Sequence, residues 1–422
     1  MLRFTENVII QMTRDCNMRC KYCYEGHNRA EWKNKYIDHE TFKKIVDTAI
    51  YYRCILGRVE NPINFHFHGG EVLLVPWEEL KKDIEYLQMR KTVFPGISWC
   101  MQSNGLGITE EIARYFSQRG ISFGISYDGR HATGRMTPSA TDAFVHRLKQ
   151  LNTDYGLRFS SLSVITKENM KDWLADMQEV DDFFDSYGMN FLCPDYTNED
   201  IVPTPEEQWV YCYKPVLETF LTPRPLKERN LLTILQIFVE KKLFGLPKLY
   251  KTGCFDKLCG YGANMTSISP DLKAHPCDKF LEEGIYREMI DDISITKKDF
   301  LGLQQTLKTC QFYEQMFKLF DQNHCHSCPV DSMCAGDCQV FNISKLGHPQ
   351  IDSSLCQVRR NIYNFLEEHW WEILQNLSIT LSAKIGDVVA VLPSTVAELE
   401  KHNLRIEYDM SNNSVFLVPN EV

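Results

Sequence analysis

Short apolar segments alternate with longer amphipathic ones through the first two thirds of this chain. Strands are predicted where β-forming residues gather in runs of about four to eight. Such runs span 7–13, 63–69, 97–104, 121–128, 159–166 and 189–196. Segments of helical periodicity lie between them, at 39–52, 77–90, 109–119, 140–152 and 169–184. The alternation predicts parallel βα units wound right-handed, and therefore an α/β fold built on a partial (β/α)6 barrel of the TIM type.

The alternation stops after residue 196. Two helical stretches follow, PEEQWVYCYKPVLETFL and LLTILQIFVEKKLF, and then a region dense in cysteine from 254 to 356. The chain continues with a helix through NIYNFLEEHWWEILQNL and a small strand-helix-hairpin pattern. A length of 422 residues favours more than one unit. We expect a barrel over 1–230, a second module over 231–356 and a small α+β tail over 357–422.

Composition excludes several classes of protein. Hydrophobic residues make up 44% and charged residues 24%, which is ordinary for a globular chain. No apolar run is long enough to span a bilayer, and the start has no secretion signal, so a cytoplasmic location is expected and membrane spanning is not. The net charge of -10, without a basic patch, disfavours a nucleic-acid partner.

The chain has 16 cysteines, nine of them between residues 254 and 356. A disulfide scaffold is typically short, secreted and richer in cysteine. In a reducing compartment, clustered thiols indicate metal ligands first. The five cysteines outside the motifs need no special role, because a buried free cysteine behaves as a small apolar residue. They are Cys54, Cys100, Cys193, Cys212 and Cys310.

The sequence CNMRCKYC at 16–23 directly follows the first predicted strand. Ligands in parallel α/β folds bind at the carboxyl ends of strands. Three thiolates alone do not complete a tetrahedral zinc site, whereas on a four-iron cluster they leave one iron with an open position. Cys16, Cys20 and Cys23 therefore favour an iron-sulfur cluster that binds a further ligand, and a zinc knuckle is the alternative.

This spacing resembles the radical S-adenosylmethionine (SAM) family. The resemblance implies that SAM chelates the open iron, and that its reductive cleavage yields a 5'-deoxyadenosyl radical. Tyr22 occupies the aromatic position that packs near adenine in family members, and HFHGGEVLL supplies the Gly-Gly-Glu motif at the end of the second strand. By the same resemblance, further SAM contacts are expected from the motif and from the ends of strands three and four. These residues are Gly69, Gly70, Glu71, Asn104, Ser126 and Arg135.

The second cysteine region resembles the SPASM domain, which holds two auxiliary four-iron clusters. The resemblance assigns the distal cluster to Cys325, Cys328, Cys334 and Cys356. It assigns the proximal cluster to Cys259, Cys277 and Cys338, with Cys254 as fourth ligand and Cys310 as its rival. Three [4Fe-4S] clusters are thus expected in the chain. Leu272 departs from the family pattern, which has glycine there, and a turn without glycine is strained. A pair of zinc sites is the alternative.

Auxiliary clusters suit a two-electron oxidation, which also requires a base. Asp278, directly after Cys277, is the predicted base, because sulfatase maturases carry an aspartate there. The expected partners are a precursor peptide or protein and a one-electron reductant such as flavodoxin or ferredoxin. The context CKYCYEG favours a maturase that forms a thioether or carbon-carbon cross-link in a ribosomal peptide, with the tail holding a leader peptide by strand addition. The alternatives are an anaerobic sulfatase maturase, which oxidises Cys or Ser to formylglycine, and a non-catalytic zinc-binding protein.

Overall fold

The computed structural model describes most of the predicted barrel and parts of the chain beyond it. The described residues are 3–4, 6–23, 29–55, 62–121, 123–192, 199–244, 250–251, 265–275, 277–278, 293–294, 307–334, 336, 338–339, 349–381, 393–409 and 414–420. Among them, no helix is both long and apolar enough to cross a bilayer.

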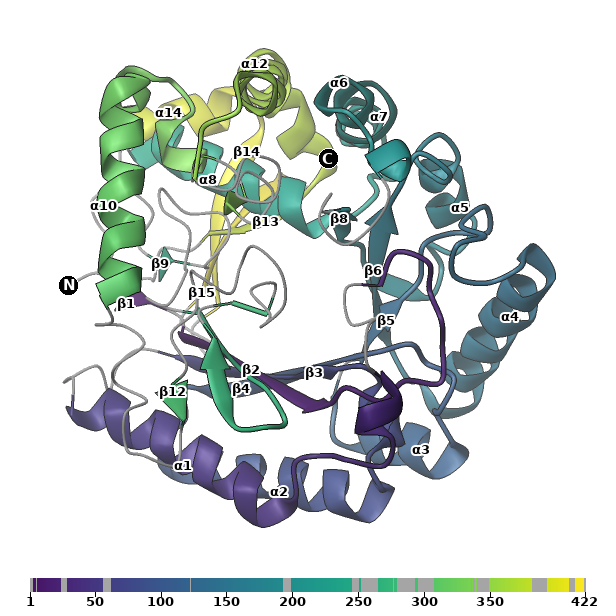
Figure 1. Cartoon of the computed structure of the whole chain (residues 1–422). Coiled ribbons are helices and arrows are strands. Elements are labelled where there is room, and N and C mark those ends of the chain that lie inside the picture. The colour runs from purple at the N-terminus through teal and green to yellow at the C-terminus, as the bar shows by residue number, and fades with distance from the viewer. Residues whose placement is uncertain are drawn as a thin grey trace.

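All six predicted strands are present in one curved sheet (Figure 1). They are β2 (Glu6–Thr13), β3 (Ile63–Gly69), β4 (Ile97–Ser103), β5 (Phe123–Ser126), β6 (Phe159–Ile165) and β8 (Met189–Phe191). β2 to β6 pair in parallel and in chain order, and β8 pairs in parallel with β6. The partial-barrel prediction is therefore confirmed.

Four further strands extend the sheet at its two ends. They are β7 (Phe184–Ser186), β10 (Met265–Ile268), β11 (Lys273–His275) and β12 (Ile293–Ser294). The strand order is β12-β11-β10-β2-β3-β4-β5-β6-β7, with β8 beside β6. β10 pairs in parallel with β2, so that Ser267 lies opposite Ile9. The cysteine-rich region thus continues the barrel sheet. A separate two-residue ladder joins β1 (Arg3–Phe4) to β9 (Tyr250–Lys251).

Side chains alternate between the two faces of each strand, because successive residues of a strand point to opposite sides. On β3, Ile63, Phe65 and Phe67 are buried against the outer helices, and the Phe67 ring stacks on Phe42 at 5.3 Å. The other face of β3 carries polar side chains toward the barrel interior. Figure 1 shows the outer helices along the convex side of the sheet. They are α1 (His39–Ile55), α2 (Trp77–Val93), α3 (Glu110–Gln118), α4 (Pro138–Tyr155) and α5 (Trp173–Gln178).

Two predicted helices differ from the structure. The helix expected over 169–184 is limited to α5, because the Asn169 side chain accepts a bond from Thr166 N at 2.8 Å and so favours a turn. The helix expected over 205–221 is divided into α6 (Pro205–Gln208), a π-helical turn (Trp209–Tyr213) and α7 (Lys214–Thr219). Pro215 accounts for the division, because proline lacks the N–H that an α-helix requires four residues after Tyr211.

The tail and three of the later helices lie at predicted positions. The helices are α8 (Arg229–Phe244), α12 (Ser353–Asn376), which begins before its predicted start at residue 361, and α14 (Pro393–Lys401). A further helix, α10 (Leu307–Gln322), was not predicted. Short 3-10 turns lie at Arg29–Trp32, Val72–Leu74, Glu199–Ile201, Cys325–Ser327 and Asp331–Met333. A small sheet in the order β13-β15-β14 is formed by Ile379–Leu381, Ser414–Pro419 and Leu404–Asp409. The tail therefore has the predicted strand-helix-hairpin form, while the three domain boundaries stay predictions.

Candidate active site

The loop after β2 carries the first three cysteines and is fixed by hydrogen bonds within the loop. The Asp15 side chain accepts a bond from Cys16 N at 2.9 Å, and Arg19 donates to the Cys16 carbonyl at 2.8 Å. Cys23 N donates to the Cys20 carbonyl at 3.2 Å. Cys16 is buried, and Cys20 and Cys23 are partly exposed. All three line one pocket at the carboxyl end of the strands, where the sequence predicted them.

Gly69 and Gly70 are required by the close approach of this loop. A Cβ on Gly69 would lie 2.1 Å from the Thr13 carbonyl oxygen, and a Cβ on Gly70 would lie 2.2 Å from the Asp15 carbonyl oxygen. Gly70 N donates to Thr13 O at 2.7 Å. Both glycines also line the pocket. Because they lack a side chain, the two glycines allow the cysteine loop to pack closely against β3. This role is additional to the SAM contacts that the sequence predicted for them.

Glu71 lies behind the pocket wall and is 2% exposed. Its carboxylate accepts bonds from Leu73 N at 2.9 Å, Ser103 Oγ at 2.7 Å and Asn104 N at 2.6 Å. Burial nevertheless raises the pKa of Glu71 above its usual value. The described contacts of Glu71 are with the protein, and they hold the end of β4 in place. Its predicted contact with the SAM ammonium stays a prediction.

Asn104 and Ser126 both line the pocket, at the ends of β4 and β5. Asn104 Nδ2 donates to Asn17 Oδ1 at 2.7 Å and lies 4.0 Å from Cys16 Sγ, so it connects β4 to the cysteine loop. Ser126 Oγ accepts a bond from Gln102 Nε2 at 2.9 Å, and Gln102 is itself a lining residue. The predicted strand-end residues are therefore brought to one place.

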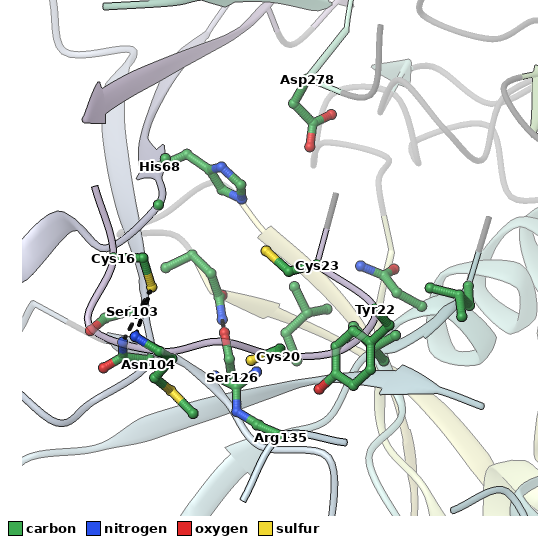
Figure 2. Close-up of a pocket in the computed structure, with 18 of the residues that line it drawn as sticks. Cys16, Cys20, Tyr22, Cys23, His68, Ser103, Asn104, Ser126, Arg135 and Asp278 are labelled. Carbon is green, nitrogen blue, oxygen red and sulfur yellow. Dashed lines mark hydrogen bonds between the residues drawn. The ribbon is translucent and has the colours of Figure 1, made fainter. Parts of the chain in front are cut away.

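The pocket has the chemistry that a cluster with SAM requires. Figure 2 shows the three cysteines on one loop, with Tyr22, Ser126 and Arg135 around the same space. The pocket encloses about 1200 Å³, part of it open to solvent. The Arg135 side chain is 10% exposed, and within the described residues its buried Nε has no hydrogen-bond partner. Burial raises the pKa of the Cys20 thiol, while the Arg135 charge lowers it. Three thiols, an unused guanidinium donor and a cavity together fit an iron-sulfur cluster and SAM.

Asp278 and His68 line the pocket on the side away from Arg135. In Figure 2, Asp278 projects into the space from the side opposite Arg135, and His68 lies between Asp278 and Cys16. Asp278 Oδ1 accepts a bond from Cys277 Sγ at 3.1 Å. The predicted base therefore lines the pocket that holds the three cysteines.

A second cavity, of about 960 Å³, holds the four cysteines assigned to the distal cluster. This cavity is lined by Cys325, Cys328, Cys334 and Cys356, and also by Arg360. Burial raises the pKa of Cys325, and the neighbouring thiols of Cys334 and Cys328 raise it further. Their convergence comes from three elements, two 3-10 turns and the first turn of α12.

The structure describes only some of the cysteines that were assigned to the proximal cluster. Cys254 and Cys259 lie outside the described residues, as does Cys193. For Cys310 the structure describes only the backbone, within α10. Cys277 is partly exposed and Cys338 is exposed. Among the described residues, no three His, Cys, Asp or Glu side chains converge on a single-ion site. The fourth proximal ligand therefore stays open.

Leu272 shows the strain that its place in the family pattern predicts. It lies in the turn between β10 and β11 with φ at +65°, a region that glycine occupies readily and leucine does not. Leu272 N donates to Ser269 O at 2.9 Å. The turn is thus formed without glycine, directly before the strand that leads to Cys277.

The sequence analysis did not identify every residue of the site, and two polar residues that it missed are His68 and Asp128. His68 lies at the inward-facing position of β3 just before the glycine pair, and alternation along β3 was the available signal. Asp128, in the segment SYDG, accepts bonds from the Tyr22 hydroxyl and from Val164 N. The signal for Asp128 was its place at a strand end, which Ser126 shares.

The chain is similar to known proteins of one superfamily. The Radical SAM superfamily model matches residues 10–180. A cysteine-type anaerobic sulfatase-maturating enzyme of Clostridium perfringens is 22% identical over 371 residues, which cover 83% of this chain and 93% of the relative. A serine-type anaerobic sulfatase-maturating enzyme of Bacteroides thetaiotaomicron is 27% identical over 177 residues, 39% of this chain and 41% of the relative.

A solved structure has the same fold. Native anSMEcpe with bound AdoMet superposes with a TM-score of 0.67 at 20% identity, over 86% of this chain and 97% of the other. Another structure of that protein contains AdoMet and the Cp18Cys peptide, with a TM-score of 0.65 at 20% identity, over the same shares of the two chains. This chain therefore contains a radical SAM domain over residues 10–180, and it is a radical SAM enzyme homologous to the anaerobic sulfatase maturases.

Proposed function

We propose that this enzyme oxidises a cysteine or serine side chain of a peptide or protein to formylglycine. The observation that carries the proposal is the single pocket in which Cys16, Cys20 and Cys23 face Asp278 across an open space. The homology to cysteine-type and serine-type sulfatase maturases supports this reaction. It favours the formylglycine alternative over the peptide cross-link that the sequence suggested first.

In this proposal, Cys16, Cys20 and Cys23 hold the cluster, while Asn104, Ser126 and Arg135 orient SAM. When bound, the two groups supply a radical that removes a hydrogen atom from the substrate carbon. Asp278 takes the proton of the substrate thiol or hydroxyl as the second electron is removed from the carbon radical, so that a C=S or C=O double bond forms. Support for this role comes from its place across the pocket from Arg135.

The auxiliary clusters are proposed as the acceptors of the second electron. The distal one would be held by Cys325, Cys328, Cys334 and Cys356, which share one cavity. A Cys356→Ser variant is then expected to lose about four irons per chain, while retaining those of the N-terminal cluster. Cys54→Ser is the matched control, because Cys54 is exposed and outside every motif. Unchanged iron in Cys356→Ser would contradict the distal assignment.

The substrate and reaction are tested with a cysteine peptide. Anaerobically purified enzyme is incubated with SAM, a one-electron reductant such as flavodoxin or ferredoxin, and the Cp18Cys peptide that a relative binds. Oxidation of the cysteine gives a thioaldehyde, and water then hydrolyses it to the formylglycine aldehyde with release of hydrogen sulfide. A hydrazide reagent labels the aldehyde. A cross-linked product retains its sulfur, loses only hydrogen and does not react with hydrazide. A product of the second kind, from this or another peptide, would overturn the proposal in favour of the cross-linking maturase.

The base assignment is tested separately with Asp278→Asn. We expect product formation to fall by about 10²- to 10⁴-fold, the range for loss of a general base, while SAM cleavage continues. Asp185→Asn is the control, because Asp185 is an acid on the surface that pairs with Arg158. An Asp278→Asn enzyme with full turnover would remove the base role without affecting the SAM assignment.

A further inference from the structure

Asp128 is a buried acid at the end of β5 that the proposed reaction does not use directly. It is 1% exposed. Its carboxylate accepts a bond from Val164 N on β6 at 2.7 Å and another from the Tyr22 hydroxyl. Arg135 Nη1 lies 3.6 Å from the same carboxylate. The Asp128 side chain therefore contacts strand β6, the cysteine loop and the segment that carries Arg135.

A buried carboxylate needs such partners, because an unpaired charge in the protein interior is very costly. Burial raises the pKa of Asp128, while the Arg135 charge and the Val164 N–H lower it. Arg135 also needs a partner of opposite charge, because its side chain is only 10% exposed. The two charges compensate one another. Arg135 lines the pocket, and its buried Nε has no partner in the part of the chain that the structure describes.

The cysteine loop and the segment that carries Arg135 are also joined by a backbone hydrogen bond. Lys21 N, between two of the cluster cysteines, donates to Gly134 O at 2.9 Å. Gly134 N donates to the Glu168 carboxylate at 3.0 Å, and a Cβ added to Gly134 would contact the Tyr22 ring at 3.4 Å. These backbone contacts hold the segment around Gly134 against the cysteine loop. Asp128 adds a charged group that contacts both Tyr22 and Arg135.

We propose that Asp128 is a positioning residue for SAM, which holds the Arg135 guanidinium and the Tyr22 ring in one arrangement around the pocket. Arg135, which lines the pocket, then meets an acceptor of the ligand, and the Tyr22 ring forms a fixed wall. The inference rests on the SAM-dependent part of the proposed function and not on the identity of the peptide substrate.

The test compares SAM binding to the anaerobically purified wild type and to Asp128→Asn, by equilibrium dialysis with radiolabelled SAM. Loss of an outer partner of this kind typically costs about 10- to 100-fold in affinity, and we expect the Kd for SAM to rise by that factor. The iron content is expected to be unchanged, because Asp128 is not among the thiol ligands. Asp185→Asn serves as control, since it removes the same charge from an exposed pair.

A second variant separates positioning from a general loss of structure. If Asp128 acts through Arg135, then Asp128→Asn in an Arg135→Gln background has little further effect on the Kd, since coupled residues are not additive. Losses that simply multiply would overturn the inference, as would a wild-type Kd in Asp128→Asn. If Asp128→Asn does not fold, Tyr22→Phe decides, because it removes one contact and keeps the ring. A raised Kd in Tyr22→Phe supports the inference, and an unchanged Kd overturns it. Failure of the wild type to bind SAM would instead refute the proposed function.

Discussion

Replacement of Gly70 by alanine tests how the cysteine loop is held. The new methyl group would lie 2.2 Å from the Asp15 carbonyl oxygen and 2.6 Å from that of Arg14. All of the nearest atoms belong to the backbone, so no side-chain rotation relieves the overlap. The loop must withdraw until the distance from Cβ to the Asp15 oxygen exceeds about 3 Å, which moves the residue directly before Cys16.

The magnitude follows from what that movement breaks. Glu71 N donates to Asp15 O at 2.8 Å and Gly70 N donates to Thr13 O at 2.7 Å, and both bonds lie at the point of overlap. A buried donor left without its acceptor costs about 1 to 3 kcal/mol, and overpacking costs a similar amount. We therefore expect the free energy of unfolding to fall by about 2 to 5 kcal/mol.

Urea unfolding and iron counts on anaerobically purified protein measure the two consequences. Gly70→Ala is expected to lose stability and the iron of the N-terminal cluster together. Gly120→Ala is the control, because Gly120 has φ at +60° with nothing within 4 Å of its Cβ position. It should lose about 1 to 2 kcal/mol from backbone strain and keep its iron. A Gly70→Ala protein with wild-type stability and full iron would refute this account of the loop.

Three other predictions concern stability, each measured by urea unfolding. Glu71→Gln puts an amide group where a carboxylate oxygen accepts a bond, for example from Asn104 N, and should cost about 1 to 3 kcal/mol; no loss would contradict the described contacts. Burial raises the pKa of Asp83 to about 7 although His39 lies 2.7 Å away. The folded state thus keeps a proton that the unfolded state releases near pH 3.8, so stability falls as pH rises between these values. Asp83→Asn should flatten this part of the profile, and an unchanged slope would argue against the raised pKa. Leu272→Gly should relieve a positive φ and raise stability by about 1 kcal/mol, whereas a loss would indicate that leucine packing outweighs the strain.

The strands of the barrel were predictable because their apolar residues alternate and are set off by helical periodicity. β3, for example, has the same bounds as predicted, Ile63–Gly69. β7 was not predicted, because it is only three residues long and begins at the end of the helix predicted over 169–184. β10 was not predicted, because it is short and pairs with a strand far away in the sequence. Met265–Ile268 becomes a strand by pairing with β2, about 260 residues earlier, and no local pattern encodes that pairing.

The site was predictable where a motif fixes both residue type and place. Cys16, Cys20 and Cys23 follow a strand in the spacing of the family, and the structure puts them at one pocket with Asp278. Asp128 and Glu71 show the opposite case, because their roles depend on which groups converge on them in space. The sequence motif identifies Glu71, yet only the fold shows its carboxylate turned toward β4.

The pairing of β10 with β2 has a consequence for any substrate in the pocket. The cysteine loop extends from the end of β2, and Cys277 and Asp278 follow the β10-β11 hairpin. The separation between Cys16 and Asp278 is therefore determined by strand register, and not by the docking of two independent bodies. A slip of two residues along β2 would preserve which side chains face inward, but it would displace Asp278 by about 7 Å relative to the cysteines. The distance across the pocket from Cys16 to Asp278 is thus set by the backbone hydrogen bonds between β2 and β10. Side-chain substitutions in the pocket can change its lining without changing that distance.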